Sequence, residues 1–184
     1  MTNFKNSTKY KNPLIVLYLT SSKNITHILS DIFADKNIME DIIQEKISAD
    51  HLLYVSLKYT KTCDVIVNLL FRWKRMIETC IESILTHAKK KKKIKSIPNS
   101  PLAKLEEIKK LFKKDKEFLK VLEMYEMFRK IKELRKERIG EFRKNVNLKV
   151  FYRGKEININ LEMLKIYAED LEKFISKTKQ FLLS

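Results

Sequence analysis

Residues 48–88 read SADHLLYVSLKYTKTCDVIVNLLFRWKRMIETCIESILTHA, and this stretch contains neither glycine nor proline. Part of it repeats at alternating spacings of four and three, the pattern of a helix that packs lengthwise against other helices. The repeating residues are Tyr59, Cys63, Ile66, Leu70, Trp73, Ile77, Cys80, Ile84 and His87. Apolar residues between Val65 and Met76 widen this stripe. We therefore predict a long central helix from Ser48 to Ala88 that other helices cover on most sides.

The composition agrees with a mainly α fold. The chain has 184 residues, of which 44% are hydrophobic, and this is enough to bury one sizeable core. It has only two glycines and three prolines, which disfavours an all-β fold or a Rossmann-like fold with many tight turns. We predict a single domain over residues 1–184, built as an up-down helical bundle around the central helix. Residues 1–12 should be flexible, and residues 89–100 should form a basic loop.

The segment before the central helix is expected to be helical for most of its length. Residues 14–20 fit either a strand or a helical turn, because a short apolar run does not distinguish the two. Residues 25–33 then repeat at helical spacing. Asn37 and Glu40 have the spacing of a capping box for a further short helix, and Ser48 is expected to cap the central helix.

The segment after the central helix contains three predicted helices and a hairpin. Ser100 and the proline that follows it fit the start of a helix. The next helix is expected over residues 115–142. The pattern then alternates, which predicts a small β-hairpin near residues 146–160 with its turn at Gly154. Asn160 should cap a final amphipathic helix.

The chain is strongly basic, with 39 Lys and Arg against 23 Asp and Glu and a formal net charge of +16. An excess of this kind favours a polyanionic partner such as RNA. The excess is mostly lysine, however, and lysine enrichment with little glutamine is also typical of heat-adapted proteomes. Charge alone therefore does not identify the partner.

Several kinds of chemistry are disfavoured by the motifs that the chain lacks. Two isolated glycines do not provide a phosphate-binding loop of the Walker or dinucleotide type. The three histidines are scattered and no cysteine pair has metal-ligand spacing, so we expect neither a metal nor a cofactor. Cys63 and Cys80 would lie about 25 Å apart on one helix and could not form a disulfide. We expect buried thiols in a cytoplasmic protein with no membrane segment.

The seven arginines fall in two parts of the chain, although lysine supplies most of the positive charge. A planar guanidinium is suited to two roles: ion pairing with carboxylates inside the fold, and binding of phosphate or another anion. In the first role Arg135 or Arg138 would pair with Asp64, Glu78 or Glu82. In the second role the candidate anion-binding residues are Arg72, Arg75, Arg129, Arg135, Arg138 and Arg143.

The order of elements over residues 48–183 resembles that of the HEPN-type helical domains of prokaryotes. The resemblance rests on the long helix at 49–85, the lysine-rich excursion, the basic run FRKIKELRKER at 128–138 and the closing amphipathic helix. Many HEPN domains are ribonucleases in which an arginine is followed four to six residues later by histidine. Arg135 or Arg138 would be that arginine, but no histidine follows His87. The resemblance therefore implies a non-catalytic member that binds nucleic acid or a partner.

Three functions remain in consideration. The first is a non-enzymatic protein that binds nucleic acid, RNA rather than DNA, through an arginine and lysine surface. The second is a homo-oligomeric assembly protein, such as a homodimer, with an apolar patch around Ile28, Ile32 and Phe33. The third is a degenerate HEPN-type ribonuclease that uses Tyr125 or Tyr152 in place of histidine.

Overall fold

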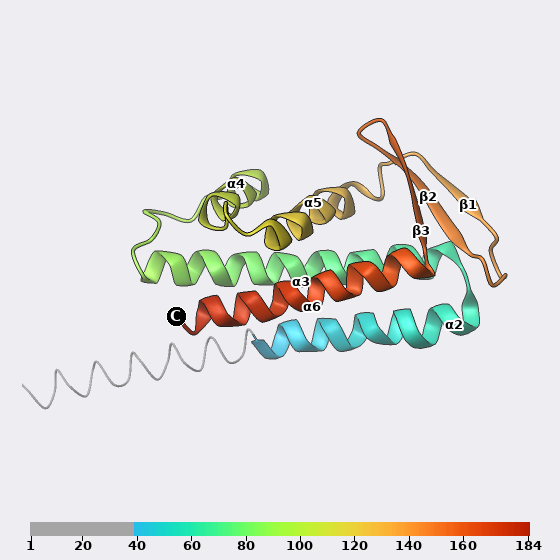
Figure 1. The fold of residues 1–184 in the computed structure, drawn as a ribbon, viewed down its shortest axis with the longest axis horizontal. Helices are drawn as coiled ribbons and strands as arrows, with labels where there is room; N and C mark the ends of the chain where they lie inside the picture. Colours follow the sequence, from blue (N-terminus) through green and yellow to red (C-terminus); the bar gives the residue numbers. More distant parts are fainter. Residues whose placement is uncertain (1–38) are drawn as a thin grey trace, which may run out of the picture. The chain divides into compact units, whose positions relative to one another are not determined.

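The structure is a computed structural model that describes residues 39–184, all of which belong to one unit of the chain. The fold is mainly α with a small antiparallel sheet, as predicted (Figure 1). The elements expected over residues 14–20 and 25–33, the capping role of Asn37 and the apolar patch around Ile28 lie outside the described residues. No helix within residues 39–184 is long and apolar enough to cross a membrane.

The predicted central helix is two helices joined by a tight turn. Residues 39–60 form the first one, which is α-helical to residue 51, π-helical in η1 (Leu52–Ser56) and α-helical again in α2 (Leu57–Thr60). Lys61 is left-handed with a φ of 49°, Thr62 is extended, and α3 (Cys63–Lys90) then runs back along helix 39–60 (Figure 1). The prediction of one helix over residues 48–88 was therefore wrong, and Ser48 lies inside a helix instead of capping one.

The turn at Lys61 lies between residues that favour helix weakly. Threonine is a weak helix former because its branched side chain loses rotamer freedom in a helix, and Thr60 and Thr62 flank Lys61. The first free N–H of α3, on Cys63, donates to the Glu141 carboxylate at 3.0 Å. This partner comes from a distant loop, so local sequence does not reveal it.

Helix α3 is the centre of the fold, and its predicted stripe from Cys63 to His87 is buried throughout. The Trp73 ring lies 6.2 Å from Phe128 of α5 (Lys116–Lys130) and 6.4 Å from Tyr167 of α6 (Leu161–Leu182). Tyr59, the first residue of the predicted stripe, is 75% exposed because the turn at Lys61 removes it from the core.

The predicted helix over residues 115–142 ends at Lys130, which corrects a second expectation. Asp115 caps it by accepting the Phe118 N–H at 3.0 Å. Beyond Lys130 the chain turns and enters strand β1 (Lys136–Ile139), the strand that the periodicity did not predict. The Lys136 ammonium donates to the carbonyls of Ile131 and Lys132 at 3.1 and 2.8 Å and so satisfies groups that a longer helix would have bonded internally.

The sheet contains the predicted hairpin with β1 added at one edge. Strands β2 (Asn147–Tyr152) and β3 (Lys155–Asn160) pair antiparallel, from Asn147 opposite Asn160 to Tyr152 opposite Lys155. The two-residue turn is formed by Arg153 and Gly154, with φ values of 51° and 74°. β1 pairs with the other side of β2, so the strand order is β1-β2-β3.

The two remaining helices begin where the sequence predicts. The Ser100 hydroxyl accepts the Ala103 N–H at the start of α4 (Pro101–Leu111), and the Asn160 side chain accepts the Met163 N–H at the start of α6. The basic segment after α3 is a loop, in which the Lys91 ammonium donates to the Ser184 carbonyl at 2.8 Å and Lys93 lies over the Phe181 ring.

Candidate nucleic-acid interface

The six arginines proposed from the sequence as anion-binding residues do not form one surface. Arg72 and Arg75 of α3 share one carboxylate, Glu45 of helix 39–60, at 3.2 and 3.1 Å. Arg129 lies on α5 with its guanidinium 5.7 Å from the centre of the Tyr125 ring. Arg143 follows β1 in an exposed loop.

Arg135 and Arg138 lie at the sheet and not on a helix. The Arg138 guanidinium forms two hydrogen bonds to Asp64, at 3.1 and 2.6 Å, which is one of the ion pairs that the sequence suggested. Both side chains are largely exposed, so the pair is not a buried one. The hydrogen bond and charge of Asp64 raise the pKa of Arg138. Arg135 lies over the Phe151 ring at 4.7 Å and pairs with Glu137 at 3.5 Å.

A different set of cations gathers at the end of the fold where helix 39–60 turns into α3. We call this surface the basic end face. Its cations are Lys58, Lys61, Arg143, Lys144 and Lys165. Four of these cations line one groove, and within residues 39–184 no carboxylate lies within salt-bridge distance of any of the five. The face therefore keeps its positive charge without internal neutralisation.

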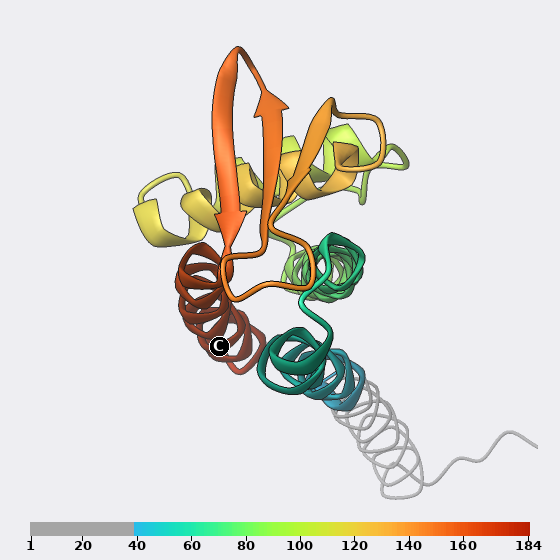
Figure 2. The same cartoon turned by 90° about the vertical axis from the view of Figure 1, so that its right-hand side faces the viewer.

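The groove of the basic end face has an apolar floor beneath a rim of lysines. Its volume is about 290 Å³. The floor and walls are formed by Leu53, Tyr54, Leu57, Val146 and Leu161. These residues come from helix 39–60, the loop before β2 and the first turn of α6, and Figure 2 views the fold from this end.

Exposed aromatic rings lie among these cations. Tyr54 is 55% exposed, Tyr59 is 75% exposed and Phe142 is 76% exposed. The Lys58 ammonium lies 5.8 Å from the centre of the Tyr59 ring. Phe142 is held beside the turn, since its N–H donates to the Lys61 carbonyl at 2.8 Å.

The loop that carries Phe142, Arg143 and Lys144 is tied to the helical turn at several points. Glu141 accepts the Cys63 N–H at 3.0 Å, and the Cys63 thiol donates to the Asn147 carbonyl at 3.5 Å. Burial raises the pKa of the Cys63 thiol, so this donor stays protonated. Together with the pair between Arg138 and Asp64, these contacts fix the loop relative to helix 39–60 and α3.

Sequence reasoning missed this face because it followed the arginines. The lysines of the face are spread from position 58 to position 165, and only the turn at Lys61 and the loop before β2 bring them together. Two local signals were present: tyrosines interleaved with Lys58 and Lys61, and the run Phe142-Arg143-Lys144. Aromatic and basic residues in alternation are the composition of single-strand-binding surfaces.

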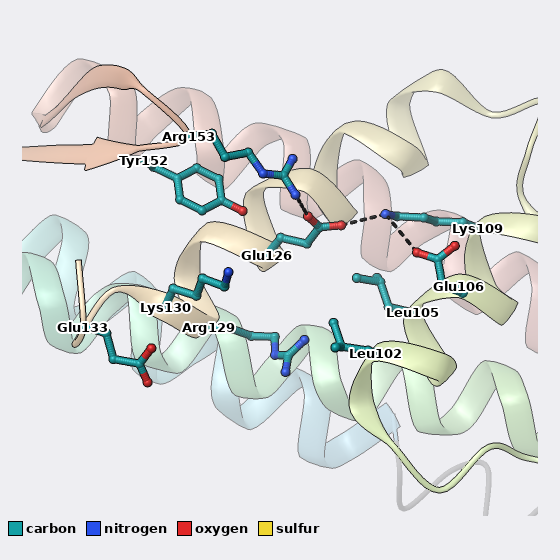
Figure 3. Close-up of a pocket in the computed structure, with 10 residues that line it drawn as sticks. All are labelled: Leu102, Leu105, Glu106, Lys109, Glu126, Arg129, Lys130, Glu133, Tyr152 and Arg153. Atoms are coloured by element: carbon teal, nitrogen blue, oxygen red, sulfur yellow. Dashed lines mark hydrogen bonds and ion pairs between the residues drawn. The ribbon is translucent and has the colours of Figure 1, made fainter. Parts of the chain in front are cut away.

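A second hollow lies between α4, α5 and the turn that joins β2 to β3, and we call it the α4–α5 cleft (Figure 3). Its volume is about 470 Å³. Glu126 forms part of its wall. Its carboxylate accepts a hydrogen bond from the Lys109 ammonium at 2.6 Å and another from the Arg153 guanidinium of the β2–β3 turn. Burial would raise the pKa of Glu126, but the hydrogen bonds and charges of Lys109 and Arg153 outweigh burial and lower it.

Of the two tyrosines considered as substitutes for histidine, only Tyr152 lines the α4–α5 cleft. The Tyr125 hydroxyl instead donates to Glu78 at 3.1 Å, and burial together with the charge of Glu78 raises its pKa above the ordinary value. A tyrosine that holds its proton more tightly than usual is a poor general base.

We compared the chain with protein-family models, curated proteins and solved structures, and none of these matches it.

Proposed function

We propose that this protein binds single-stranded RNA through the basic end face, without catalysing a reaction. One observation carries the proposal: Lys58, Lys61, Lys144 and Lys165 surround one groove, no carboxylate of residues 39–184 pairs with them, and exposed aromatic rings lie beside them. Cations supply the contacts to phosphates, while aromatic side chains supply surfaces on which unpaired bases stack. A duplex hides the faces of its bases, so exposed rings favour a single strand as the ligand.

Charge and rigidity both support this assignment. The ion pairs of Arg72, Arg75, Arg135 and Arg138 leave those arginines partly neutralised, whereas the cations of the basic end face have no such partner among the described residues. The loop contacts at Cys63 and Lys61 hold Phe142 and Lys144 in place before a ligand arrives. Preorganisation of this kind lowers the entropy lost on binding.

The test is fluorescence anisotropy with a labelled single-stranded RNA of mixed sequence, titrated with the full chain at several salt concentrations. Replacing Lys61, Lys144 and Lys165 together by alanine should weaken binding by about tenfold or more and reduce the log–log salt slope by about 2. Replacing Tyr59 or Phe142 by alanine should each cost about 1–3 kcal/mol of binding free energy with little change in salt slope.

The matched control removes the same charge elsewhere. Lys113 and Lys114 of the α4–α5 connection and Lys116 at the start of α5 are exposed and have no ion pair among the described residues. Their triple alanine variant has the same net charge as the first and should bind RNA nearly as well as the wild type. Equal losses in the two triple variants would show general charge attraction without a site, and no binding by the wild type would end the proposal.

The choice of RNA over DNA, the HEPN-type relationship and a cytoplasmic location are part of the same proposal. The first two rest only on the order of elements expected from the sequence, of which the structure divides one long helix at Lys61 and ends another at Lys130. DNA of the same sequence is the direct comparison. The location is supported by two unpaired, buried cysteines, of which Cys80 is shielded so well that burial raises its pKa to about 12.

Self-association is a second candidate function, favoured by a separate observation. Ile43, Ile47 and Tyr54 recur at spacings of four and seven on helix 39–60, and each is about half exposed. An apolar stripe on an outer helix is typical of an interface with another copy or another protein.

A further inference from the structure

We propose that the α4–α5 cleft binds a phosphate group, either free or carried by a small organic molecule. The cleft is formed by different elements from those of the basic end face. Tyr152 and Arg153 at one end of the β2–β3 hairpin line the cleft, whereas Val146, next to the other end of the hairpin, lines the groove of the face. The inference therefore does not depend on RNA binding.

Some charges of the α4–α5 cleft are neutralised within the cleft itself. Lys109 lies between Glu126 at 2.6 Å and Glu106 at 3.6 Å, and Arg153 pairs with Glu126. These pairs, drawn as dashed lines in Figure 3, fix the wall between α4 and the hairpin turn. Within residues 39–184 no ion pair involves the other two cations of the cleft.

Those other cations are Arg129 and Lys130 of α5. The Arg129 guanidinium contacts the Tyr125 ring but pairs with no carboxylate among the described residues, and Lys130 is exposed with no ion pair there. Glu133 also lines the cleft, so the unpaired groups carry a small positive excess. A bound anion would neutralise this positive excess.

Tyr152 supplies a second, independent observation. Its hydroxyl oxygen is buried and has no hydrogen-bond partner within the described part of the chain. The Arg153 guanidinium lies over the ring, 5.1 Å from its centre. Buried polar groups are nearly always paired, because an unpaired one loses its hydration without compensation. In Figure 3 this hydroxyl and the Lys130 ammonium both point into the cleft. A ligand oxygen that reached this hydroxyl, after a small shift of the side chains that shield it, would satisfy both groups.

The number of donors favours phosphate over carboxylate. Arg129, Lys130 and Tyr152 all line the cleft, with the Arg129 guanidinium on the side of Leu102 and the Tyr152 hydroxyl on the side of Glu126. A phosphate group offers three terminal oxygens where a carboxylate offers two. Leu102 and Leu105 of α4 line the same cleft, and Leu102 is 64% exposed. An organic phosphate could place its apolar part on these leucines, and the volume of about 470 Å³ lies in the range of small-molecule sites.

The test is calorimetric titration of the full chain with inorganic phosphate and, separately, with adenosine monophosphate. We expect binding that weakens about tenfold in Arg129→Gln and is also weaker in Lys130→Gln and Tyr152→Phe. Tighter binding of the nucleotide would identify an organic phosphate as the ligand, and equal binding would identify the free ion. Absence of binding by both probes, or unchanged affinity in Arg129→Gln, would overturn the inference.

Two controls separate a ligand site from a structural role. Without ligand, Tyr152→Phe should unfold at the same temperature as the wild type or higher, since it removes an unpaired hydroxyl, whereas Tyr125→Phe should unfold lower because it removes the bond to Glu78. A lower unfolding temperature for Tyr152→Phe would show a structural partner for the hydroxyl and contradict the argument. The triple variant at Lys61, Lys144 and Lys165 should bind both probes as the wild type does, which keeps this test distinct from the RNA test.

Discussion

Glu126 is a half-buried carboxylate that pairs with two cations. Its side chain is 13% exposed, and it receives both Lys109 and Arg153, so it joins α4, α5 and the hairpin turn. Glu126→Gln keeps the size of the side chain but removes its charge. We expect a loss of about 1–3 kcal/mol in the free energy of unfolding, measured by urea denaturation at neutral pH.

The lowered pKa of Glu126 also predicts a dependence on pH. Because the folded pKa lies below the ordinary value of 4.5, the stabilisation is present above that value and disappears as the pH falls through the folded pKa. Stability measured from about pH 6 down to about pH 3 should therefore fall less in Glu126→Gln than in the wild type. Parallel curves would show that Glu126 does not contribute to acid unfolding.

At the scale of elements, the two glycines provide a matched pair. Both have positive φ, 63° at Gly140 and 74° at Gly154. A Cβ at Gly140 would lie 2.9 Å from the Asn145 carbonyl oxygen, whereas one at Gly154 would meet nothing within 4 Å. Gly154→Ala should cost about 1 kcal/mol for the left-handed backbone alone, and Gly140→Ala about 2–3 kcal/mol.

Urea denaturation of the two variants checks this prediction. The larger loss at Gly140 should be accompanied by weaker RNA binding, because the loop after Gly140 carries Phe142 and Lys144 to the basic end face. Gly154→Ala should leave RNA binding unchanged. Equal losses of stability in Gly140→Ala and Gly154→Ala would mean that the loop after Gly140 moves to accommodate the added methyl group.

The elements that the sequence predicted correctly are those that local chemistry determines. Ser100 and Asn160 cap helices with their own side chains, and the turn at Gly154 depends on two adjacent residues. The break at Lys61 and strand β1 were missed because their partners are remote: Glu141 bonds the start of α3, and β1 exists only beside β2. The same holds for the basic end face, whose lysines meet only in the folded chain.

At the scale of the whole molecule, the exposed stripe of helix 39–60 can be tested by hydrodynamics. If Ile43, Ile47 and Tyr54 join two copies, the wild type should sediment as a dimer and Ile47→Glu as a monomer. Lys110→Gln, at an exposed position of α4, changes the net charge by the same amount and should leave the dimer intact. A wild type that stays monomeric at high concentration would remove self-association from consideration.

The turn at Lys61 has a consequence for the order in which the protein is made. It places helix 39–60, synthesised early, beside the first turn of α6, which leaves the ribosome about a hundred residues later. A nascent chain that has not reached Lys165 therefore carries only part of the basic end face. If the face binds RNA as proposed, its groove and its full affinity would be complete only once that late segment has docked.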